Sequence, residues 1–234
     1  MRRSSAAAGT SDRLLAAATE LFATRGFAGT SIREIAERAG ANVAAGHYHY
    51  GSKRGLYLQV LREQFAEVRA SLERRGATRS QPALRTASRA ELIALLGARI
   101  AAMLDLLLGP PPQAHGALLL REMVDPTDAL PIIVDEFIRP RTHEMEAIVR
   151  RLAPAAGRAA VRSIVWSIVG QVLFYHFTLP ATLLMLKRRA YPRGFPRQIA
   201  RHIAAFSLGG LERVASAPVS ARRRARRVLN ARHA

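Results

Sequence analysis

Residues 30–56, TSIREIAERAGANVAAGHYHYGSKRGL, constrain the fold more than any other part of the chain. Their start has the pattern of a helix N-terminus, because Thr30 or Ser31 can cap a helix and Ser31 has Glu34 three residues later. Such a capping box satisfies two backbone N–H groups that the first helical turn leaves unpaired. Apolar residues then recur at helical spacing on one face, and charged residues occupy the other. The sequence therefore predicts a short amphipathic helix at this point.

A tight turn is predicted to end this helix. Gly40 can adopt the left-handed backbone that terminates helices, and Asn42 can cap a second helix almost immediately. The second helix, residues 43–50, begins with small side chains and ends in alternating histidine and tyrosine. A helix that enters a DNA major groove needs a slim leading end, with hydrogen-bonding side chains behind it for phosphates. We therefore expect a helix-turn-helix at about residues 31–50.

A third helix is predicted to start just after Ser52, which can cap it. Its first turn carries Lys53 and Arg54 beside the positive end of the helix dipole, an arrangement that suits a DNA phosphate. Apolar residues at spacings of three and four continue to about Arg75, so this helix would span roughly 30 Å. A helix of that length can join a DNA-binding head to a separate body and transmit movement between them.

The first third of the chain resembles the TetR family of bacterial transcriptional regulators. The matching segments are Leu21-Phe22, Gly26-Phe27, Thr30-Ser31, Ile35-Ala36, Ala39-Gly40-Ala41, His47-Tyr48-His49-Tyr50 and Gly51-Ser52-Lys53. Gly46 departs from the pattern, because the family usually has leucine or another apolar residue there. The wording NVAA…YH…GSK and a later REM…P motif, residues 121–126, are similar to the TetR subgroup that includes CecR.

The resemblance implies an all-α protein with two domains. An N-terminal three-helix DNA-binding domain would occupy residues 8–68, and a helical ligand-binding and dimerisation domain would occupy residues 88–216. Residues 217–234 are rich in arginine and contain no acidic residue, so we expect them to form a basic, disordered tail. The resemblance also implies that two helices near the C-terminal end of each subunit pair with those of a second copy in a four-helix interface.

The rest of the chain also has helical periodicity. Further helices are predicted at residues 11–25, from the Ser88–Glu91 capping box to Leu108, and at residues 114–124, 129–152, 158–179 and 196–216. The polar stretch 76–89 is predicted to be a loop or a domain boundary. Gly109 and the prolines after it should end one helix, and Pro140 should kink another or remove one of its hydrogen bonds. The helix at 196–216 is expected to pair with the helix at 158–179.

Residues 163–186 contain no Asp, Glu, Lys or Arg, and a run of that length could cross a bilayer. Several polar side chains interrupt the run, among them Gln171, and Pro180 would cut a spanning helix. No second candidate span follows it in the sequence. A helix that is buried at a subunit interface or around a pocket produces the same pattern. We therefore expect no membrane span.

The composition favours a globular protein that binds polyanions. The chain has 234 residues, 49% of them hydrophobic, which is enough for a core. Its formal net charge of +19 comes almost wholly from arginine and points to nucleic acid first and anionic membrane second, although an arginine-rich genome would also raise it. It has no cysteine, and its N-terminal residues lack the apolar segment of a secretory signal. We expect a cytoplasmic, nucleoid-associated protein.

No pattern in the chain indicates catalysis. The segment from Gly46 to Lys53 resembles a phosphate-binding loop, but the order of its Lys and Ser is reversed and no strand precedes it. His47 and His49 lie two residues apart, so on a helix they point to nearly opposite sides and cannot chelate one metal. No Ser/His/Asp set or carboxylate pair stands out. We expect no enzyme activity, no cofactor and no metal site.

These features predict a homodimeric transcriptional regulator, most simply a repressor, whose helix 43–50 enters successive major grooves of a near-palindromic operator. The candidate contacts to base edges and the groove are Arg33, Asn42, Val43, Ala44 and Ala45. The candidate phosphate contacts are Thr30, His47, Tyr48 and Lys53. Two plainer interpretations remain open: Asn42 serves only as a helix cap, and Arg33 is only solvated.

The body of the protein is expected to bind a small, mostly apolar effector that swings the two heads out of groove register. The candidate pocket residues are Met103, Arg121, Glu122, Phe137, Trp166, Gln171 and Tyr175. Alternatively, Arg121 and Glu122 form a structural ion pair, and the aromatic residues belong to the core or to the dimer interface. Two other functions remain open: a sequence-indifferent DNA-coating protein, which would explain the charge, and a membrane-associated helical protein.

Overall fold

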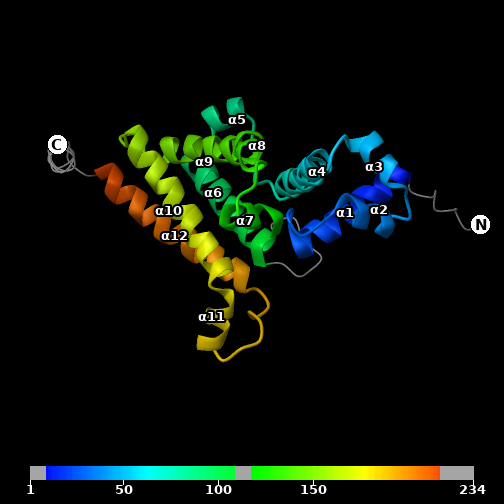
Figure 1. Cartoon of the computed structure of the whole chain (residues 1–234). Coiled ribbons are helices and arrows are strands. Elements are labelled where there is room, and N and C mark those ends of the chain that lie inside the picture. Colours follow the sequence, from blue (N-terminus) through cyan, green and yellow to red (C-terminus); the bar gives the residue numbers. More distant parts are fainter. Residues whose placement is uncertain (1–8, 109–116, 217–234) are drawn as a thin grey trace, which may run out of the picture. The chain divides into compact units, whose positions relative to one another are not determined.

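The computed structural model describes residues 9–108 and 117–216, and within them every regular element is a helix (Figure 1). The elements are α1 (Thr10–Arg25), α2 (Ile32–Arg38), α3 (Val43–Tyr50), α4 (Lys53–Arg74), α5 (Gln81–Thr86), α6 (Arg89–Leu108), α7 (Ala117–Val124), α8 (Leu130–Ile133), the π-helical turn η1 (Val134–Ile138), α9 (Arg139–Leu152), α10 (Arg158–Phe177), α11 (Leu179–Met185) and α12 (Phe195–Ser216). The all-α prediction is confirmed. The predicted break at Gly109 and the predicted tail at 217–234 lie outside the described residues.

Internal contacts divide the chain into two units. Unit 1 comprises residues 1–71 and 109–140, so its described helices are α1 to α4 together with α7, α8 and η1. Unit 2 comprises residues 72–108 and 141–234 and contains α5, α6, nearly all of α9, and α10 to α12. The segment from α7 to η1 therefore packs with the N-terminal helices, although α5 and α6 separate it from them in the sequence. The functional domains expected at 8–68 and 88–216 stay a prediction.

Aromatic side chains form the centre of unit 1. Phe22 of α1 and Tyr57 of α4 are both fully buried, and their rings meet edge to face with centroids 4.9 Å apart. Phe27, in the connection after α1, lies 5.0 Å from the Tyr57 ring and 6.1 Å from the Phe22 ring. Such ring pairs contribute about 0.5–1.5 kcal/mol each beyond their buried area. They hold α1 against α4, and this corner supports the helix-turn-helix.

In unit 2, α6 packs against both α10 and α12, and α10 also contacts α12, which runs beside it (Figure 1). The predicted pairing of the last helix with the helix at 158–179 is confirmed. The three helices contribute the buried apolar residues Leu92, Leu95, Leu96, Ile100 and Leu104 from α6, Val161, Val165, Ile168 and Val172 from α10, and Ala200, Ile203 and Leu211 from α12. Most of these residues recur three, four or eight positions apart, which places them on one face of each helix and explains why these segments fold as helices around one core.

The loop predicted at residues 76–89 is wrong in part, because it contains the short helix α5. The Ser80 hydroxyl accepts a hydrogen bond from the Ala83 backbone N–H, which caps the helix. Pro82 lies in the first turn, where its missing N–H is not needed. Pro82 therefore starts a helix here instead of breaking one.

The helix predicted at residues 129–152 is present as an unbroken helical segment from Leu130 to Leu152, made of α8, η1 and α9 in succession. The π-helical turn Val134–Ile138 ends two residues before Pro140. A proline inside a helix clashes with the carbonyl four residues earlier and lacks an N–H donor. The wider turn accommodates both effects, so the predicted interruption is present as a local change of helix type.

The uncharged run at residues 163–186 is divided between two helices. The helix predicted to reach Leu179 ends at Phe177, and Pro180 lies in the first turn of α11. By length and composition alone, α10 is the one described helix that could cross a membrane, and 22% of its apolar window is buried in the structure. Core helices of soluble proteins meet the same criterion, so the membrane alternative receives only weak support.

Candidate nucleic-acid interface

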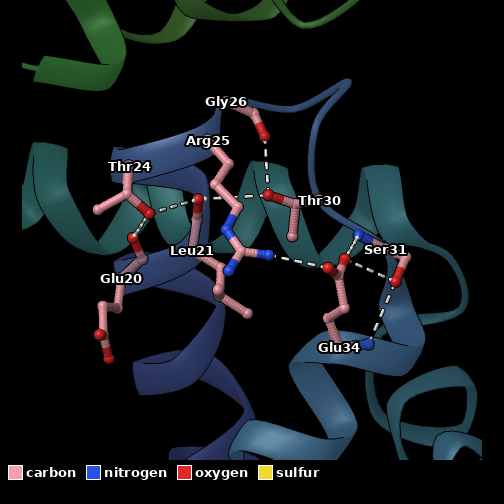
Figure 2. A network of polar contacts seen from close by, with 8 residues as sticks. All are labelled: Glu20, Leu21, Thr24, Arg25, Gly26, Thr30, Ser31 and Glu34. Carbon is pink, nitrogen blue, oxygen red and sulfur yellow. Dashed lines mark hydrogen bonds and ion pairs between the residues drawn. The ribbon is translucent and has the colours of Figure 1, made fainter.

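The corner between α1 and α2 is held by a compact polar network (Figure 2). The Ser31 hydroxyl accepts a hydrogen bond from the Glu34 N–H at 3.2 Å, and the Glu34 carboxylate accepts one from the Ser31 N–H at 2.8 Å. This is the predicted capping box. Arg25 at the end of α1 pairs with the same carboxylate at 2.8 Å. The hydrogen bonds from Ser31 and the charge of Arg25 lower the pKa of Glu34, so the carboxylate stays ionised and keeps α2 oriented on α1.

Thr30 belongs to this network more than to the protein surface. Its side chain is buried, with only 2% of the residue exposed. Its hydroxyl points to two carbonyl oxygens at the end of α1, those of Leu21 at 3.2 Å and Gly26 at 2.9 Å (Figure 2). A hydroxyl has one proton to donate, and here it is already shared. The geometry therefore favours a structural role for Thr30, and its expected phosphate contact stays a prediction.

The turn and α3 follow the predicted capping chemistry. Gly40 has a φ of 59°, in the left-handed region, and the Asn42 side chain accepts a hydrogen bond from the Ala44 N–H at 3.0 Å. Gly46, the departure from the family pattern, is buried against α2. A Cβ built there would lie 3.4 Å from the Ile32 side chain, so anything larger than alanine would press on α2. The glycine therefore permits a close approach of α2 and α3.

The step from α3 into α4 depends on two further glycines. Gly51 has a φ of 72°, and Ser52 caps α4 by accepting a hydrogen bond from the Gly55 N–H at 3.0 Å. A Cβ built on Gly55 would lie closer to the carbonyl oxygen of Tyr50 than real Cβ atoms come to a backbone atom. Sequence reasoning did not identify Gly55, because its only signal is a glycine in the first turn of a helix that otherwise looks regular.

The side chain of Tyr50 ties the end of α3 to α1. Its hydroxyl donates to the Ser11 carbonyl oxygen at 3.0 Å and lies 2.8 Å from the Ser11 hydroxyl. Arg13 of α1 donates from Nε to the Ala39 carbonyl oxygen in the turn at 3.1 Å. Both contacts join residues that are far apart in sequence, so no local pattern predicts them. Together with the Gly46 and Gly55 contacts they fix the position of α3 in unit 1.

The residues expected to contact DNA differ in exposure. Arg33, Asn42, Ala44, His47 and Tyr48 are exposed, and 87% of Tyr48 is accessible. Val43 and Ala45 are half-buried and pack against the apolar core of unit 1. Of the three small residues at the start of α3, Ala44 is therefore the one that presents a slim, accessible surface. Arg33 is paired with Glu37 at 3.3 Å on the solvent-exposed side of α2.

A hollow lies between the α1–α2 connection and the start of α4. Its lining consists of Ala28, Gly29, Thr30, Ser31, Ile32, Glu34, His47, Ser52 and Lys53. The Lys53 ammonium lies 4.3 Å from the centre of the Phe27 ring, in cation–π contact, at the positive end of α4. The only acidic group in the lining, Glu34, is already paired with Arg25. An anion such as a phosphate suits the Lys53 side of this hollow.

The residues expected to line an effector pocket are distributed over both units. Arg121, Glu122 and Phe137 belong to unit 1, and Met103, Trp166, Gln171 and Tyr175 belong to unit 2. Glu122 is buried and accepts hydrogen bonds from Tyr57 and Thr127, and Phe137 stacks on Phe65 with ring centroids 4.1 Å apart.

In unit 2, Gln171 donates to the Ser167 carbonyl oxygen and to the Ser207 hydroxyl, at 3.2 and 3.4 Å. The Tyr175 ring meets Phe195 edge to face with centroids 5.9 Å apart, and 61% of Trp166 is exposed. Contacts within the protein thus occupy the carboxylate of Glu122 and the side-chain NH₂ group of Gln171, and the ligand role of all seven residues stays a prediction.

Two protein-family models match the sequence. The model of the bacterial regulatory proteins of the tetR family matches residues 14–60, which run from α1 into α4. The model of the C-terminal domain of the HTH-type transcriptional dual regulator CecR matches residues 92–211, from α6 to α12. A curated relative, the probable HTH-type transcriptional regulator YttP of Bacillus subtilis (strain 168), is 39% identical over 64 residues, which are 27% of this chain and 31% of YttP. The chain thus matches about a third of the length of that relative.

Several solved structures share the fold. The hemolysin II transcriptional regulator HlyIIR is 23% identical, with 84% of this chain and 95% of HlyIIR covered and a TM-score of 0.51. A TetR-family regulator from Mesorhizobium loti MAFF303099 is 20% identical, with coverage of 88% and 96% and a TM-score of 0.55. FadR from Bacillus subtilis, solved in complex with stearoyl-CoA, is 15% identical, with coverage of 85% and 98% and a TM-score of 0.60. At these identities the similarity shows the fold alone.

Proposed function

Because this chain belongs to the TetR family of bacterial transcriptional regulators and carries a CecR-type C-terminal domain, we propose that it is an effector-responsive, homodimeric repressor. The observation that carries the proposal is the placement of α3. Its first turn presents Ala44 to solvent, and its last residue, Tyr50, is tied to α1. A slim helix that is rigidly supported and exposed along one side suits a DNA major groove.

The proposed operator contacts follow from exposure and charge. Ala44 allows the backbone of α3 to approach base edges, and Asn42 and Arg33 are accessible for polar contacts to bases. His47, Tyr48 and Lys53 lie farther along α3 and at the start of α4, where they can contact phosphates on the rim of the groove. Phosphate contacts position the protein, and base contacts give it sequence preference.

A second copy of the chain is proposed to cover the exposed aromatic face of α10 and α12. Trp166 and Phe174 on α10 and Phe206 on α12 are 61%, 54% and 66% exposed. Soluble proteins rarely leave several large apolar side chains exposed on neighbouring helices without a partner. A symmetric dimer would bury this face and hold two α3 helices in one assembly, as binding to a near-palindromic operator with half-sites about 34 Å apart requires.

The effector is proposed to be a small, mostly apolar molecule that binds in the helical body. FadR, which shares the fold, was solved with stearoyl-CoA, so a long acyl chain is a reasonable first probe. To convert mostly bound protein into mostly released protein, the effector must discriminate between the two conformations by about 5 kcal/mol. The protein is proposed to act in the cytoplasm, at the nucleoid.

Selection of bound sequences from a random DNA pool tests the core of this proposal. A specific dimer is expected to enrich a two-fold symmetric site with a fixed spacing between its halves. A DNA-coating protein would enrich nothing and would lose affinity with salt equally on every duplex. Failure to enrich a symmetric site would therefore refute the proposed repressor and favour DNA coating, which the net charge of +19 also suits.

Two variants separate the proposed roles. Lys53→Ala is expected to weaken binding to operator and random DNA by the same factor, because a phosphate contact carries no sequence information. Ala44→Leu is expected to weaken operator binding selectively, because its added bulk meets base edges. Ala45 is less suitable for this test, since it is half-buried and a larger residue there would disturb the core. Equal effects of the two variants on both kinds of DNA would contradict the assignment.

A further inference from the structure

Helix α7 makes two polar contacts with the helices that support α3. It lies in unit 1 and packs against α1. Its adjacent residues Arg121 and Glu122 point about 100° apart around the helix axis, so they can reach different neighbours. Glu122 contacts α4, and Arg121 contacts the end of α1.

The Glu122 contact is fully buried. Only 1% of Glu122 and 1% of Tyr57 are exposed, and the Tyr57 hydroxyl donates to the Glu122 carboxylate at 2.7 Å. Thr127, in the turn after α7, donates to the same carboxylate from its hydroxyl at 2.8 Å and from its backbone N–H at 3.0 Å. Burial and the bond to Glu122 raise the pKa of Tyr57, so its hydroxyl keeps its proton and remains a donor. Three donors thus hold a carboxylate at one fixed point on α4.

The Arg121 contact lies at the other supporting helix. Its guanidinium donates to the Arg25 carbonyl oxygen at 3.4 Å and lies over Gly26, which caps the end of α1. A Cβ built on Gly26 would overlap the guanidinium, so the absence of a side chain makes room for it. A positive charge at this end of a helix also interacts favourably with the helix dipole. Arg121 therefore links α7 to the end of α1, and Glu122 links α7 to α4.

We propose that Arg121, Glu122 and Tyr57 form a brace by which α7 sets the angle between α1 and α4 and so positions α3 on DNA. The three are positioning residues and do not touch DNA. Both α1 and α4 hold α3 in place: the Tyr50 hydroxyl of α3 donates to Ser11 of α1, and the Tyr50 carbonyl oxygen lies close to Gly55 of α4. The inference rests on the proposed function, and it adds the residues that fix the orientation of α3 within unit 1.

The chemistry of the brace favours control of orientation over bulk stability. An apolar contact tolerates sliding, whereas a buried carboxylate with three donors has one satisfied geometry. Loss of the Tyr57 hydroxyl would leave the ring packed on Phe22 and Phe27 but would remove one donor from the carboxylate. The angle between the supports would then vary, and with it the separation of the two α3 helices in a dimer.

Operator spacing provides the test. The operator obtained by selection is compared with versions that have one base pair more or fewer between the half-sites, which turns one half-site by about 35° relative to the other. A braced wild-type dimer is expected to prefer the native spacing by at least about tenfold. Tyr57→Phe and Arg121→Met are each expected to reduce this preference severalfold, mostly by improving relative binding to the altered spacings.

Tyr191→Phe is the matched control, because Tyr191 lies in unit 2 and its buried hydroxyl has no hydrogen-bond partner among the described residues. It removes the same atom from a half-buried tyrosine and is expected to leave the spacing preference unchanged. If Tyr57→Phe lowers stability to denaturant but keeps the wild-type spacing preference, the residue is only structural and the brace is overturned. Equal wild-type binding at all three spacings also overturns it.

Hydrogen exchange in the full-length protein tests the brace without DNA. Tyr57→Phe is expected to speed amide exchange in α7 and at the end of α1 severalfold, because Glu122 and Arg121 of α7 link α7 to both α4 and the end of α1. Unchanged exchange at both places overturns the brace even if an operator is found. Faster exchange in a protein that selects no operator would support the contacts and refute the proposed repressor, so the two failures are distinguishable.

Discussion

The substitution Gly55→Ala, with Gly97→Ala as its control, tests whether the corner between α3 and α4 holds α3, the proposed DNA-recognition helix, in place. Both glycines lie within helices, α4 and α6, where alanine is intrinsically favoured over glycine by about 1 kcal/mol. Around Gly97 nothing lies within 4 Å of a built Cβ, so the variant is expected to gain most of that amount. Replacement of glycine by alanine at position 97 is thus expected to stabilise the protein.

At Gly55 the same replacement is expected to destabilise the protein. The added Cβ would overlap the carbonyl oxygen of Tyr50, a backbone atom that cannot rotate away, so the corner itself must shift. Overpacking of this kind costs about 1–3 kcal/mol, which exceeds the propensity gain over most of its range. The net expectation is a loss of roughly 0–2 kcal/mol in the free energy of unfolding. Because Tyr50 ends α3 and binds Ser11, the shift should also displace α3 and weaken operator binding.

The assay is urea unfolding of both variants followed by circular dichroism, together with titration of the selected operator. Gly97→Ala is expected to unfold at a higher urea concentration and to bind the operator as the wild type does. Gly55→Ala is expected to unfold at a lower urea concentration than the wild type. It is also expected to bind the operator more weakly than the wild type at temperatures where both proteins are folded. Equal gains in stability for the two variants, or full operator affinity in Gly55→Ala, would refute the reasoning.

Three further changes have defined outcomes. Lys53→Ala should reduce by about one the slope of log binding constant against log salt concentration on any duplex, and an unchanged slope would rule out a phosphate contact. The pKa of Glu34 lies below its usual value of 4.5 because of Ser31 and Arg25, so its contribution to stability is complete above pH 4.5 and lost as the pH falls through the lowered pKa. The difference in unfolding free energy between wild type and Glu34→Gln should therefore shrink between pH 7 and pH 3. A constant difference would show that the ionised Glu34 carboxylate does not stabilise the fold through Ser31 and Arg25. Phe206→Asp should shift the protein toward monomer in sedimentation and weaken operator binding, whereas an intact dimer would place the interface elsewhere.

Local patterns in the sequence were sufficient for most of the helix-turn-helix. The caps at Ser31, Asn42 and Ser52 are present as predicted, because a cap depends on residues within one turn of each other. The interruption at Pro140 was also predictable, since the missing N–H and the ring clash are properties of proline itself. The form it takes, a π-helical turn, was not.

Positions that depend on distant neighbours were not predictable in the same way. Ala44 and Ala45 are identical residues in adjacent places, yet only the packed structure shows that the first is accessible and the second is partly covered. The loop expected at 76–89 contains α5, because Pro82 can start a helix as readily as it can end one and the choice depends on its surroundings.

The sequence by itself determined the fold class, the capped helices and the helix-turn-helix of this protein, because periodicity and capping act over one or two turns. Only the tertiary structure decided how α3 is held: by Ser11 beneath Tyr50, by the bare backbone of Gly55, and by α7 reaching Tyr57. The residues of each contact except the one at Gly55 are separated by tens of positions along the chain, and the overlap at Gly55 depends on the angle between two helices. No spacing rule encodes which distant backbone a side chain will meet.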